Sequence, residues 1–279
     1  MSSNDSDSWG AVASSYVQVE RLTTPPCQTL VNRVSLLLPL NVPNTIAFDN
    51  GCGTGVLSAV LRQQYPRLPL LATDASHGMV NILRRRIEHR KWDEVRTRVV
   101  DSRNLEGIQD GSFTHVFSTF MVCLAPEPDK IVGEMQRVMK PGGVLGLAVW
   151  GDPQFGPFST PWEKACRRLV PDYEAPMVMD AKWTFAASVE AGLVEAGFKD
   201  VVVWEEDVPW RWDDVEAVSK YYLEGNNPGN VGMIDAFKAR GGDVEEVRPI
   251  FEGIIKEDCG QKDGSIELHA PATLATARK

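Results

Sequence analysis

The residues best suited to chemistry form the run Asp49-Asn50-Gly51-Cys52-Gly53-Thr54-Gly55. The apolar stretch Thr45–Phe48 before it predicts a buried strand, and the apolar residues from Val56 onward predict a helix. Alternate glycines between a strand and a helix let the backbone approach a ligand closely. The spacing differs from the dinucleotide fingerprint Gly-x-Gly-x-x-Gly, and an acidic residue before the first glycine would repel a pyrophosphate. The run therefore predicts a turn that binds a ligand other than a dinucleotide, unless it only lets the helix pack on the strand.

This run resembles the first motif of the class I S-adenosylmethionine (SAM) dependent methyltransferases. The segment Glu134-Met135-Gln136-Arg137-Val138-Met139-Lys140-Pro141-Gly142-Gly143 is similar to the Glu-x-x-Arg-Val-Leu-Lys-Pro-Gly-Gly signature of the same family. The resemblance covers residues 45–150 well, the N-terminal helices loosely and the remaining segments poorly. It implies SAM as cofactor and S-adenosylhomocysteine as product. An acidic strand end beside a bare backbone suits the cationic portion of SAM.

Strand-like apolar runs alternate with amphipathic stretches over residues 45–205, which predicts a parallel sheet with helices on both faces. We expect strands at residues 45–49, 68–74, 96–100, 113–118, 144–150 and 201–205. The predicted fold class is α/β, with a doubly wound, Rossmann-like sheet. The family resemblance adds the expectation of seven mostly parallel strands, with an antiparallel last strand between strands five and six.

The chain is predicted to be a single methyltransferase domain over residues 1–279. Residues 1–40 are expected to form a helical cap, with residues 1–8 disordered and the helix broken into two pieces at Thr24-Pro25-Pro26. Residues 41–150 would form the SAM-binding core and residues 265–279 the last strand. Residues 151–184 and 213–264 do not fit the alternation, and we interpret them as lid insertions over the substrate.

The resemblance places the cofactor on the loops that follow the first four strands. Asp74 ends the second predicted strand, nineteen positions after Gly55, where an acidic residue can accept both ribose hydroxyls; helix capping is the alternative. Asp101 and Ser102 end the third strand and are expected to meet the adenine, with Arg103 near the ring; a surface carboxylate is the alternative. The full predicted cofactor set is Asp49, Gly51, Cys52, Gly53, Gly55, Asp74, Ala75, Met79, Asp101, Ser102, Arg103, Ser118 and Thr119.

A catalytic base has only weak candidates, His115 and His269. His115 lies mid-strand, which favours a buried core histidine, and His269 precedes the last strand. Methyl transfer needs a base only where the acceptor must lose a proton before it attacks. We therefore expect catalysis mainly by holding the acceptor in line with the sulfonium methyl, an effect that can contribute about 7–11 kcal/mol.

Aromatic residues are the candidates for binding the acceptor. Trp150 ends the fifth predicted strand, and ligands bind outside the carboxyl ends of parallel strands. Trp183 lies in the first lid stretch, and Tyr16 lies on the first helix, from which it could close over the cofactor. The alternative is that these rings form a second small core under the lid, as aromatic clusters commonly do.

Composition narrows the function classes. The chain has 279 residues and a formal net charge of −9, so it lacks the basic footprint of a nucleic-acid binder. No apolar run approaches the length of a membrane span, and the polar N-terminal residues resemble neither a secretory signal nor a transit peptide. Five scattered cysteines favour reduced thiols in a cytosolic or nuclear setting, of which we expect the cytoplasm, and no Cys/His cluster has metal-ligand spacing.

These observations predict a methyltransferase that acts on a small, largely apolar organic acceptor. Within the family, the chain is most similar to the ubiquinone/menaquinone-type and secondary-metabolite enzymes. Two alternatives remain open: an enzyme on the same fold that rearranges or cyclises its substrate without methylating it, and a non-catalytic partner protein. The sequence leaves the acceptor, its attacking atom and the oligomeric state undetermined.

Overall fold

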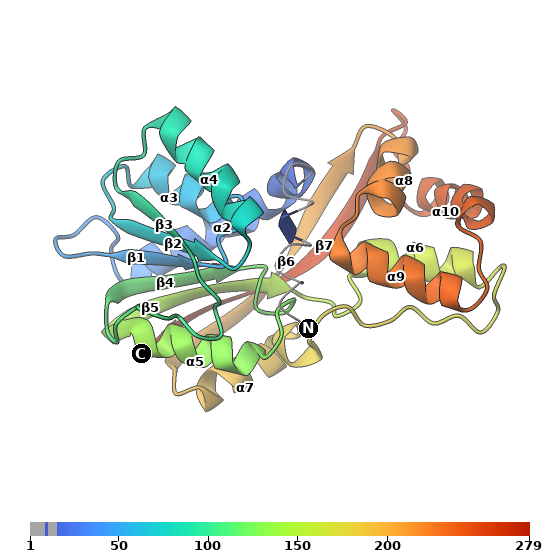
Figure 1. Cartoon of the computed structure of the whole chain (residues 1–279). Helices are drawn as coiled ribbons and strands as arrows, with labels where there is room; N and C mark the ends of the chain where they lie inside the picture. The colour runs from blue at the N-terminus through green and yellow to red at the C-terminus, as the bar shows by residue number, and fades with distance from the viewer. Residues whose placement is uncertain (1–8, 11–15) are drawn as a thin grey trace.

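A computed structural model describes residues 9–10 and 16–279 of the chain. Residues 1–8 and 11–15, which belong to the predicted N-terminal cap, lie outside the described residues, and so does the predicted disorder of residues 1–8. Figure 1 shows a twisted sheet flanked by helices, with a second group of helices beside the far ends of two long strands.

The sheet has seven strands in the order β3-β2-β1-β4-β5-β7-β6. Its first five strands in chain order are parallel, whereas β7 is antiparallel to both β5 and β6. The α/β, doubly wound fold with an antiparallel last strand is therefore confirmed. The strands are β1 (Ala47–Asn50), β2 (Leu70–Asp74), β3 (Val95–Val99), β4 (Phe113–Thr119), β5 (Met139–Trp150), β6 (Lys199–Trp212) and β7 (Ile266–Arg278).

Helices cover both faces of this sheet (Figure 1). One face carries α2 (Val17–Leu37), α3 (Val56–Gln64) and α4 (His77–Arg90), and the other carries α5 (Pro128–Val138) and α7 (Ala186–Glu195). Strand β1 is buried along its whole length, and β4 and β5 are buried over most of theirs. Burial on both faces explains why these strands read as continuous apolar runs.

The predicted break at Pro25-Pro26 is wrong, because α2 runs without interruption from Val17 to Leu37. Two prolines remove two backbone donors, which weakens the helix. The apolar face of α2 outweighs this loss: Leu30 and Val34 are fully buried, and the helix packs on α3 and the sheet. Tertiary packing therefore overrides the local preference of the prolines.

The two stretches that did not fit the alternation fold as a helical group on an extension of the sheet. Strands β6 and β7 continue past the end of β5, since β5 pairs only with residues 272–278 of β7 whereas β6 pairs with the whole strand. Trp162 lies at the centre of the group and contacts the rings of Tyr222, Phe237 and Phe251. The elements are α6 (Gly156–Cys166), α8 (Val215–Glu224), α9 (Pro228–Ala239) and α10 (Val244–Cys259). The 3-10 helix η1 (Ala181–Trp183) instead packs on α7.

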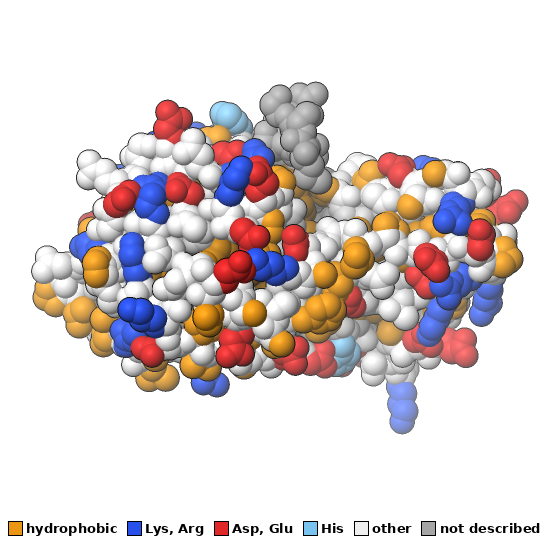
Figure 2. All heavy atoms as spheres, turned by 90° about the horizontal axis from the view of Figure 1, so that it is seen from below, with side chains coloured by type: hydrophobic (Ala, Val, Ile, Leu, Met, Phe, Trp, Pro, Cys, Tyr) orange, Lys and Arg blue, Asp and Glu red, His pale blue; other side chains and the backbone are white. Residues whose placement is uncertain are grey.

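The surface carries charges of both signs. Figure 2 shows acidic and basic side chains interspersed over one face of the molecule, with hydrophobic side chains between them. Among the helices of the described residues, none has the length and hydropathy to cross a bilayer.

The packing of α2 predicts which of its leucines stabilise the fold. Leu30 is fully buried, whereas Leu36 on the same helix is 83% exposed. Leu30→Ala should lower the free energy of unfolding by about 2–5 kcal/mol through lost contacts and a cavity. Leu36→Ala, the matched control, should change it by less than about 0.5 kcal/mol. Denaturant titration measures both variants, and similar losses in the two would contradict the packing described here.

Candidate active site

The loop after β1 turns through three left-handed glycines. Gly51, Gly53 and Gly55 have φ angles of 73°, 52° and 94°, a region in which side chains cause strain. The N–H groups of Gly51 and Cys52 donate to the Thr73 carbonyl at 2.8 and 2.9 Å, which ties the loop to the end of β2. A Cβ added at Gly51 or Gly55 would collide with a neighbouring side chain, but one at Gly53 would meet open space. The loop therefore presents bare backbone at Gly53.

Asp74, at the end of β2, faces this loop. Its carboxylate accepts the Gly53 N–H at 2.9 Å and the Ser76 N–H at 2.9 Å. Burial raises the pKa of Asp74, and these backbone hydrogen bonds oppose the rise. Ser76, rather than Asp74, caps α4, because its hydroxyl accepts the N–H of Met79. A carboxylate can accept about four hydrogen bonds, so Asp74 can accept further ones from a ligand.

Asp49 lies beneath the glycine loop and is fully buried. One carboxylate oxygen accepts the Ser58 hydroxyl at 2.7 Å, whereas Oδ1 has no hydrogen-bond partner among the described residues. Burial raises the pKa of Asp49 to about 7, against the opposing hydrogen bond from Ser58 and with a contribution from the Asp74 charge. A cation placed nearby would stabilise the ionised form.

Asn50 is a site residue that the sequence reasoning missed. Its side-chain carbonyl accepts the Ser102 hydroxyl at 2.8 Å, and its amide nitrogen is buried without a partner among the described residues. Ser118, on the neighbouring strand β4, also has a buried hydroxyl that lacks a partner in the described part of the chain. A polar residue inside a strand that otherwise reads as apolar was the available signal.

Asp101 is exposed and engages Arg103 in an ion pair of 2.7 Å. The hydrogen bonds from Arg103 lower the pKa of Asp101 and keep it ionised. Arg103 also pairs with Glu127 at 3.3 Å. The predicted contact of Asp101 with adenine therefore competes with an existing intramolecular ion pair. Ser102, in contrast, is buried against Asn50.

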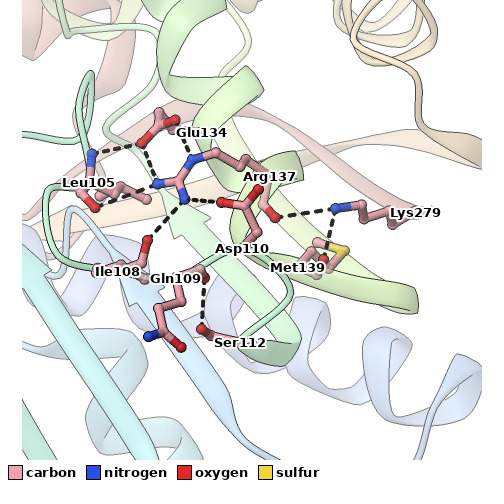
Figure 3. Close-up of polar contacts among 9 residues, drawn as sticks. All are labelled: Leu105, Ile108, Gln109, Asp110, Ser112, Glu134, Arg137, Met139 and Lys279. Carbon is pink, nitrogen blue, oxygen red and sulfur yellow. Dashed lines mark hydrogen bonds and ion pairs between the residues drawn. The ribbon is translucent and has the colours of Figure 1, made fainter.

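The loop that carries Asp101 and Ser102 is held by the second sequence motif. Figure 3 shows the Arg137 guanidinium between the carboxylates of Glu134 and Asp110, with a further hydrogen bond to the Ile108 carbonyl at 2.9 Å. Glu134 also accepts the N–H of Leu105 at 2.8 Å. These residues hold the segment between β3 and β4 against α5, so the motif positions the cofactor side of the sheet without providing chemistry.

Polar contacts join the N-terminal helix α2 to the glycine loop and to α4. The carboxylate of Glu20, on α2, accepts the Thr54 hydroxyl at 2.6 Å and pairs with Arg86 of α4 at 2.8 Å. Farther toward the N-terminus, Gly10 packs so tightly on Gly78 that a Cβ on Gly78 would lie 2.5 Å from its Cα. The cap therefore covers the start of α4, next to Asp74.

A cavity lined mainly by aromatic and aliphatic side chains lies beyond the carboxyl end of β5. Trp150 forms part of its wall and is held by Phe120 at 4.2 Å and Phe155 at 5.0 Å between ring centroids. Both phenylalanines have left-handed backbones, with φ angles of 57° and 58°. Such strain in bulky residues persists where the surrounding packing fixes it, often at functional sites.

Tyr16 connects this cavity with the glycine loop. It lines the cavity, and Tyr221 and Asp74 lie close enough for their charges to add to the rise that burial causes in its pKa. Tyr16 therefore stays a neutral phenol. Among the described residues that line the cavity, none is charged. The wall is made by Trp9, Tyr16, Val19, Leu22, Leu124, Trp150, Gln154, Phe155, Phe158, Val178, Met179, Trp210, Tyr221, Tyr222, Asn227, Gly229, Asn230 and Met233.

The structure places three other candidates away from this cavity. Trp183, predicted as a substrate residue, is fully buried beside α5 and donates its indole N–H to Asp129 at 3.0 Å, so it is a packing residue of the sheet. His115 is buried in β4, where its Nε2 bonds the Leu38 carbonyl at 2.9 Å and burial lowers its pKa. His269 lies on the outer part of β7 and pairs with Asp207 at 2.8 Å. None of the three lines the cavity.

The donor set fits SAM on structural grounds. Bare backbone at Gly53 can approach the ligand, Asp74 offers a carboxylate for two ribose hydroxyls, and the unpartnered Oδ1 of Asp49 favours a nearby cation. These groups converge at the carboxyl ends of β1 and β2, where ligands of open α/β sheets bind.

Comparisons with known proteins agree with this geometry. A family model for a methyltransferase domain matches residues 48–147. Methyltransferase ucsB of Acremonium sp is 28% identical over 213 residues, which cover 71% of this chain and 70% of that protein. The acetylaranotin bis-thiomethyltransferase of Aspergillus terreus is 28% identical over 148 residues, 51% of this chain and 48% of that protein. This chain is a class I SAM-dependent methyltransferase.

A solved structure shows the same fold. Phosphoethanolamine N-methyltransferase 2 of Haemonchus contortus, in complex with SAM, matches with a TM-score of 0.54 at 16% identity, over 90% of this chain and 52% of that chain. At this identity the likeness concerns the fold alone. For the methyltransferase described here, the family and the fold make SAM the cofactor.

Asp74→Asn tests the ribose assignment in this methyltransferase. A hydrogen bond to a charged group contributes about 1.5–3 kcal/mol, so we expect the affinity for S-adenosylhomocysteine to fall about 10- to 100-fold. Isothermal titration calorimetry measures the loss. Asp93→Asn is the matched control, because Asp93 is exposed and should leave the affinity unchanged. Equal affinities for the two variants would refute the assignment.

The raised pKa of Asp49 predicts that stability falls as pH rises. Between the ordinary pKa of an aspartate and about 7, the folded protein keeps a proton that the unfolded chain has released, so rising pH favours unfolding. At about 1.4 kcal/mol per pKa unit, the step from about pH 5 to about pH 8 removes roughly 2–3 kcal/mol. Chemical denaturation should show this loss in the wild type and a smaller one in Asp49→Asn. A loss of the same size in both proteins would contradict it.

Proposed function

We propose that this methyltransferase transfers the methyl group of SAM to a small, neutral and largely apolar acceptor that binds in the aromatic cavity. The observation that carries the proposal is that Tyr16 lines the cavity and also lies near Asp74, at the glycine loop. A wall without charged residues, among those described, disfavours ionic acceptors, because an unpaired buried charge is costly. Aromatic rings on several sides favour a flat acceptor.

The proposed roles follow from the contacts. Asp74 and the backbone of Gly53 hold the nucleoside, Asp49 compensates positive charge, and Tyr16 and Trp150 orient the acceptor. SAM, when bound, supplies a methyl group that is already activated on sulfur. The chain then has to align the acceptor and exclude water. Correct alignment of the reacting atoms by itself accelerates the transfer strongly. The neutral phenol of Tyr16 can hold the acceptor's attacking atom by a hydrogen bond. Its raised pKa keeps it protonated at neutral pH, so it does not act as a general base.

We propose further that residues 151–184 and 213–264 act as the substrate lid of a single domain. Their helices α6, α8 and α9 supply Phe158, Tyr221 and Asn230 to the cavity wall. The acidic net charge of −9 supports a small molecule rather than a nucleic acid as the partner. The scattered cysteines support a reducing, cytoplasmic setting.

The competing activity is rearrangement or cyclisation of a substrate beside SAM without methylation. Assays with methyl-labelled SAM and a set of neutral phenols, thiols and amines separate the two activities. Label in the product supports methyl transfer, whereas product formed without label supports the rival.

Trp150→Phe tests the acceptor site. The smaller ring loses contact with Phe120 and Phe155, so we expect the KM for a methylated acceptor to rise about tenfold, at about 1.4 kcal/mol for the lost contacts. The affinity for S-adenosylhomocysteine should stay unchanged. Trp183→Phe is the matched control, a buried tryptophan outside the cavity that should leave the acceptor KM unaltered. A raised KM in the control but not in Trp150→Phe would place the acceptor elsewhere.

A further inference from the structure

One end of the aromatic cavity is polar. The first turn of α9 supplies Asn227, Gly229 and Asn230 to the wall. Asn230 is only 8% exposed, and its amide nitrogen has no hydrogen-bond partner among the described residues. A buried amide donor without a partner destabilises a protein. Its presence on a cavity wall therefore points to a ligand that accepts the hydrogen bond.

The start of α9 favours an oxygen acceptor at the same place. This helix has 12 residues and begins at Pro228, and the side chain of Asn227 accepts the N–H of Gly229 at 3.0 Å. The first backbone N–H groups of a helix carry partial positive charge, which attracts an atom with negative charge. Because no described residue of the wall is a cation, a carbonyl oxygen fits better than a carboxylate or phosphate.

Neighbouring residues of the cavity wall connect Tyr16 with Asn230. Tyr16 lies near Asp74, and thus at the cofactor end. Tyr221 lies near Tyr16. The side chain of Asn227 forms a hydrogen bond with Tyr221, which opposes the rise that burial causes in the pKa of Tyr221. Asn230 follows Asn227 on the same turn of α9. An acceptor in the cavity therefore has its reacting atom near Tyr16 and its far end near Asn230.

We propose that Asn230 is a specificity-determining residue, which donates its amide N–H to a carbonyl oxygen conjugated with the reacting hydroxyl of the acceptor. This inference rests on the proposed function and names its substrate class, the hydroxyaryl ketones and related hydroxy-carbonyl compounds. Conjugation spreads the negative charge of the ionised hydroxyl onto the carbonyl oxygen. The amide and the start of α9 stabilise that charge, and so lower the pKa of the bound hydroxyl.

Such an acceptor explains how transfer proceeds with no histidine of the described chain in the cavity wall. The hydroxyl releases its proton to water, since its own acidity replaces a protein base. An electron pair of the resulting oxygen anion then forms the bond to the methyl carbon. The methyl–sulfur bond breaks at the same time, and its electron pair stays on the sulfur of S-adenosylhomocysteine.

The test uses 4-hydroxyacetophenone, whose phenol and carbonyl are conjugated, and 4-ethylphenol, which lacks the carbonyl. Both probes are titrated into the full chain saturated with S-adenosylhomocysteine, and the pKa of the bound phenol is read from the phenolate absorbance. We expect the ketone to bind the wild type at least about tenfold more tightly than 4-ethylphenol, as one hydrogen bond to a charged group allows. We also expect the rise in pKa that burial causes, measured against the value in water, to be smaller for the bound ketone than for bound 4-ethylphenol.

Asn230→Leu should abolish both differences while leaving the affinity for S-adenosylhomocysteine unchanged. It should also raise the melting temperature of the free protein, because it removes an unpartnered buried amide, whereas loss of a merely structural asparagine would lower it. Asn230→Asp, of nearly the same size, should raise the bound pKa of the ketone by repulsion. Asn32→Leu, an exposed site on α2, is the matched control and should behave like the wild type.

Three outcomes would overturn the inference: equal binding of the two probes to the wild type, an unchanged preference in Asn230→Leu, or binding of neither probe. Failure of the proposed function is distinguishable from each of them. If labelled methyl reaches a thiol or another acceptor while the Asn230 variants leave the preference unaltered, methyl transfer stands and the inference falls. If the ketone prefers the wild type but no acceptor is ever labelled, the assignment of Asn230 stands as a binding site and the methylation proposal falls.

Discussion

The structure depends on a carboxylate held against a glycine turn. Asp74, at the end of β2, accepts the N–H of Gly53, and the same turn hydrogen-bonds the Thr73 carbonyl one residue earlier on that strand. Only left-handed glycines let the backbone come this close. Asp49 lies buried below the turn, so two carboxylates raise each other's cost of ionisation in one region of low dielectric. In the complex that we propose, a cationic nucleoside relieves that cost, so contacts that stabilise the turn in the free protein would also serve binding.

Two networks fix the loops around this turn before any ligand arrives. Glu20 joins the N-terminal helix to Thr54 and Arg86, and Glu134 with Arg137 anchors the segment after β3. Rigid loops lower the entropy lost on binding, because the geometry is already present. The Glu-x-x-Arg motif thus acts at a distance from the chemistry, through the loop that it holds.

The alternating strands and helices were predictable, because hydrophobic periodicity is a local property that packing on both faces of a parallel sheet imposes. The antiparallel last strand came only from the family resemblance, since strand order is not encoded in local pattern. The prediction failed at Pro25-Pro26, where burial of Leu30 and Val34 outweighs a local preference, and at Trp183, whose aromatic ring packs in the sheet core rather than in the cavity. Asn50 and Asn230 escaped notice because a lone amide carries no spacing signal; only burial without a partner distinguishes them.

The shape of the cavity also bears on how this enzyme can work with so little acid–base machinery. His115 and His269 lie outside the wall, and burial keeps Tyr16 protonated. An uncharged aromatic wall cannot ionise a reluctant hydroxyl, but it can hold a ring in one plane and strengthen the field of any dipole that points at it. The side-chain amides of the described wall, Gln154, Asn227 and Asn230, are dipoles of that kind. All three come from residues 151–184 and 213–264, so selectivity for the acceptor and its activation would both reside in the proposed lid rather than in the fold shared by the family. The family model matches residues 48–147, outside the proposed lid, as such a division of labour would lead us to expect.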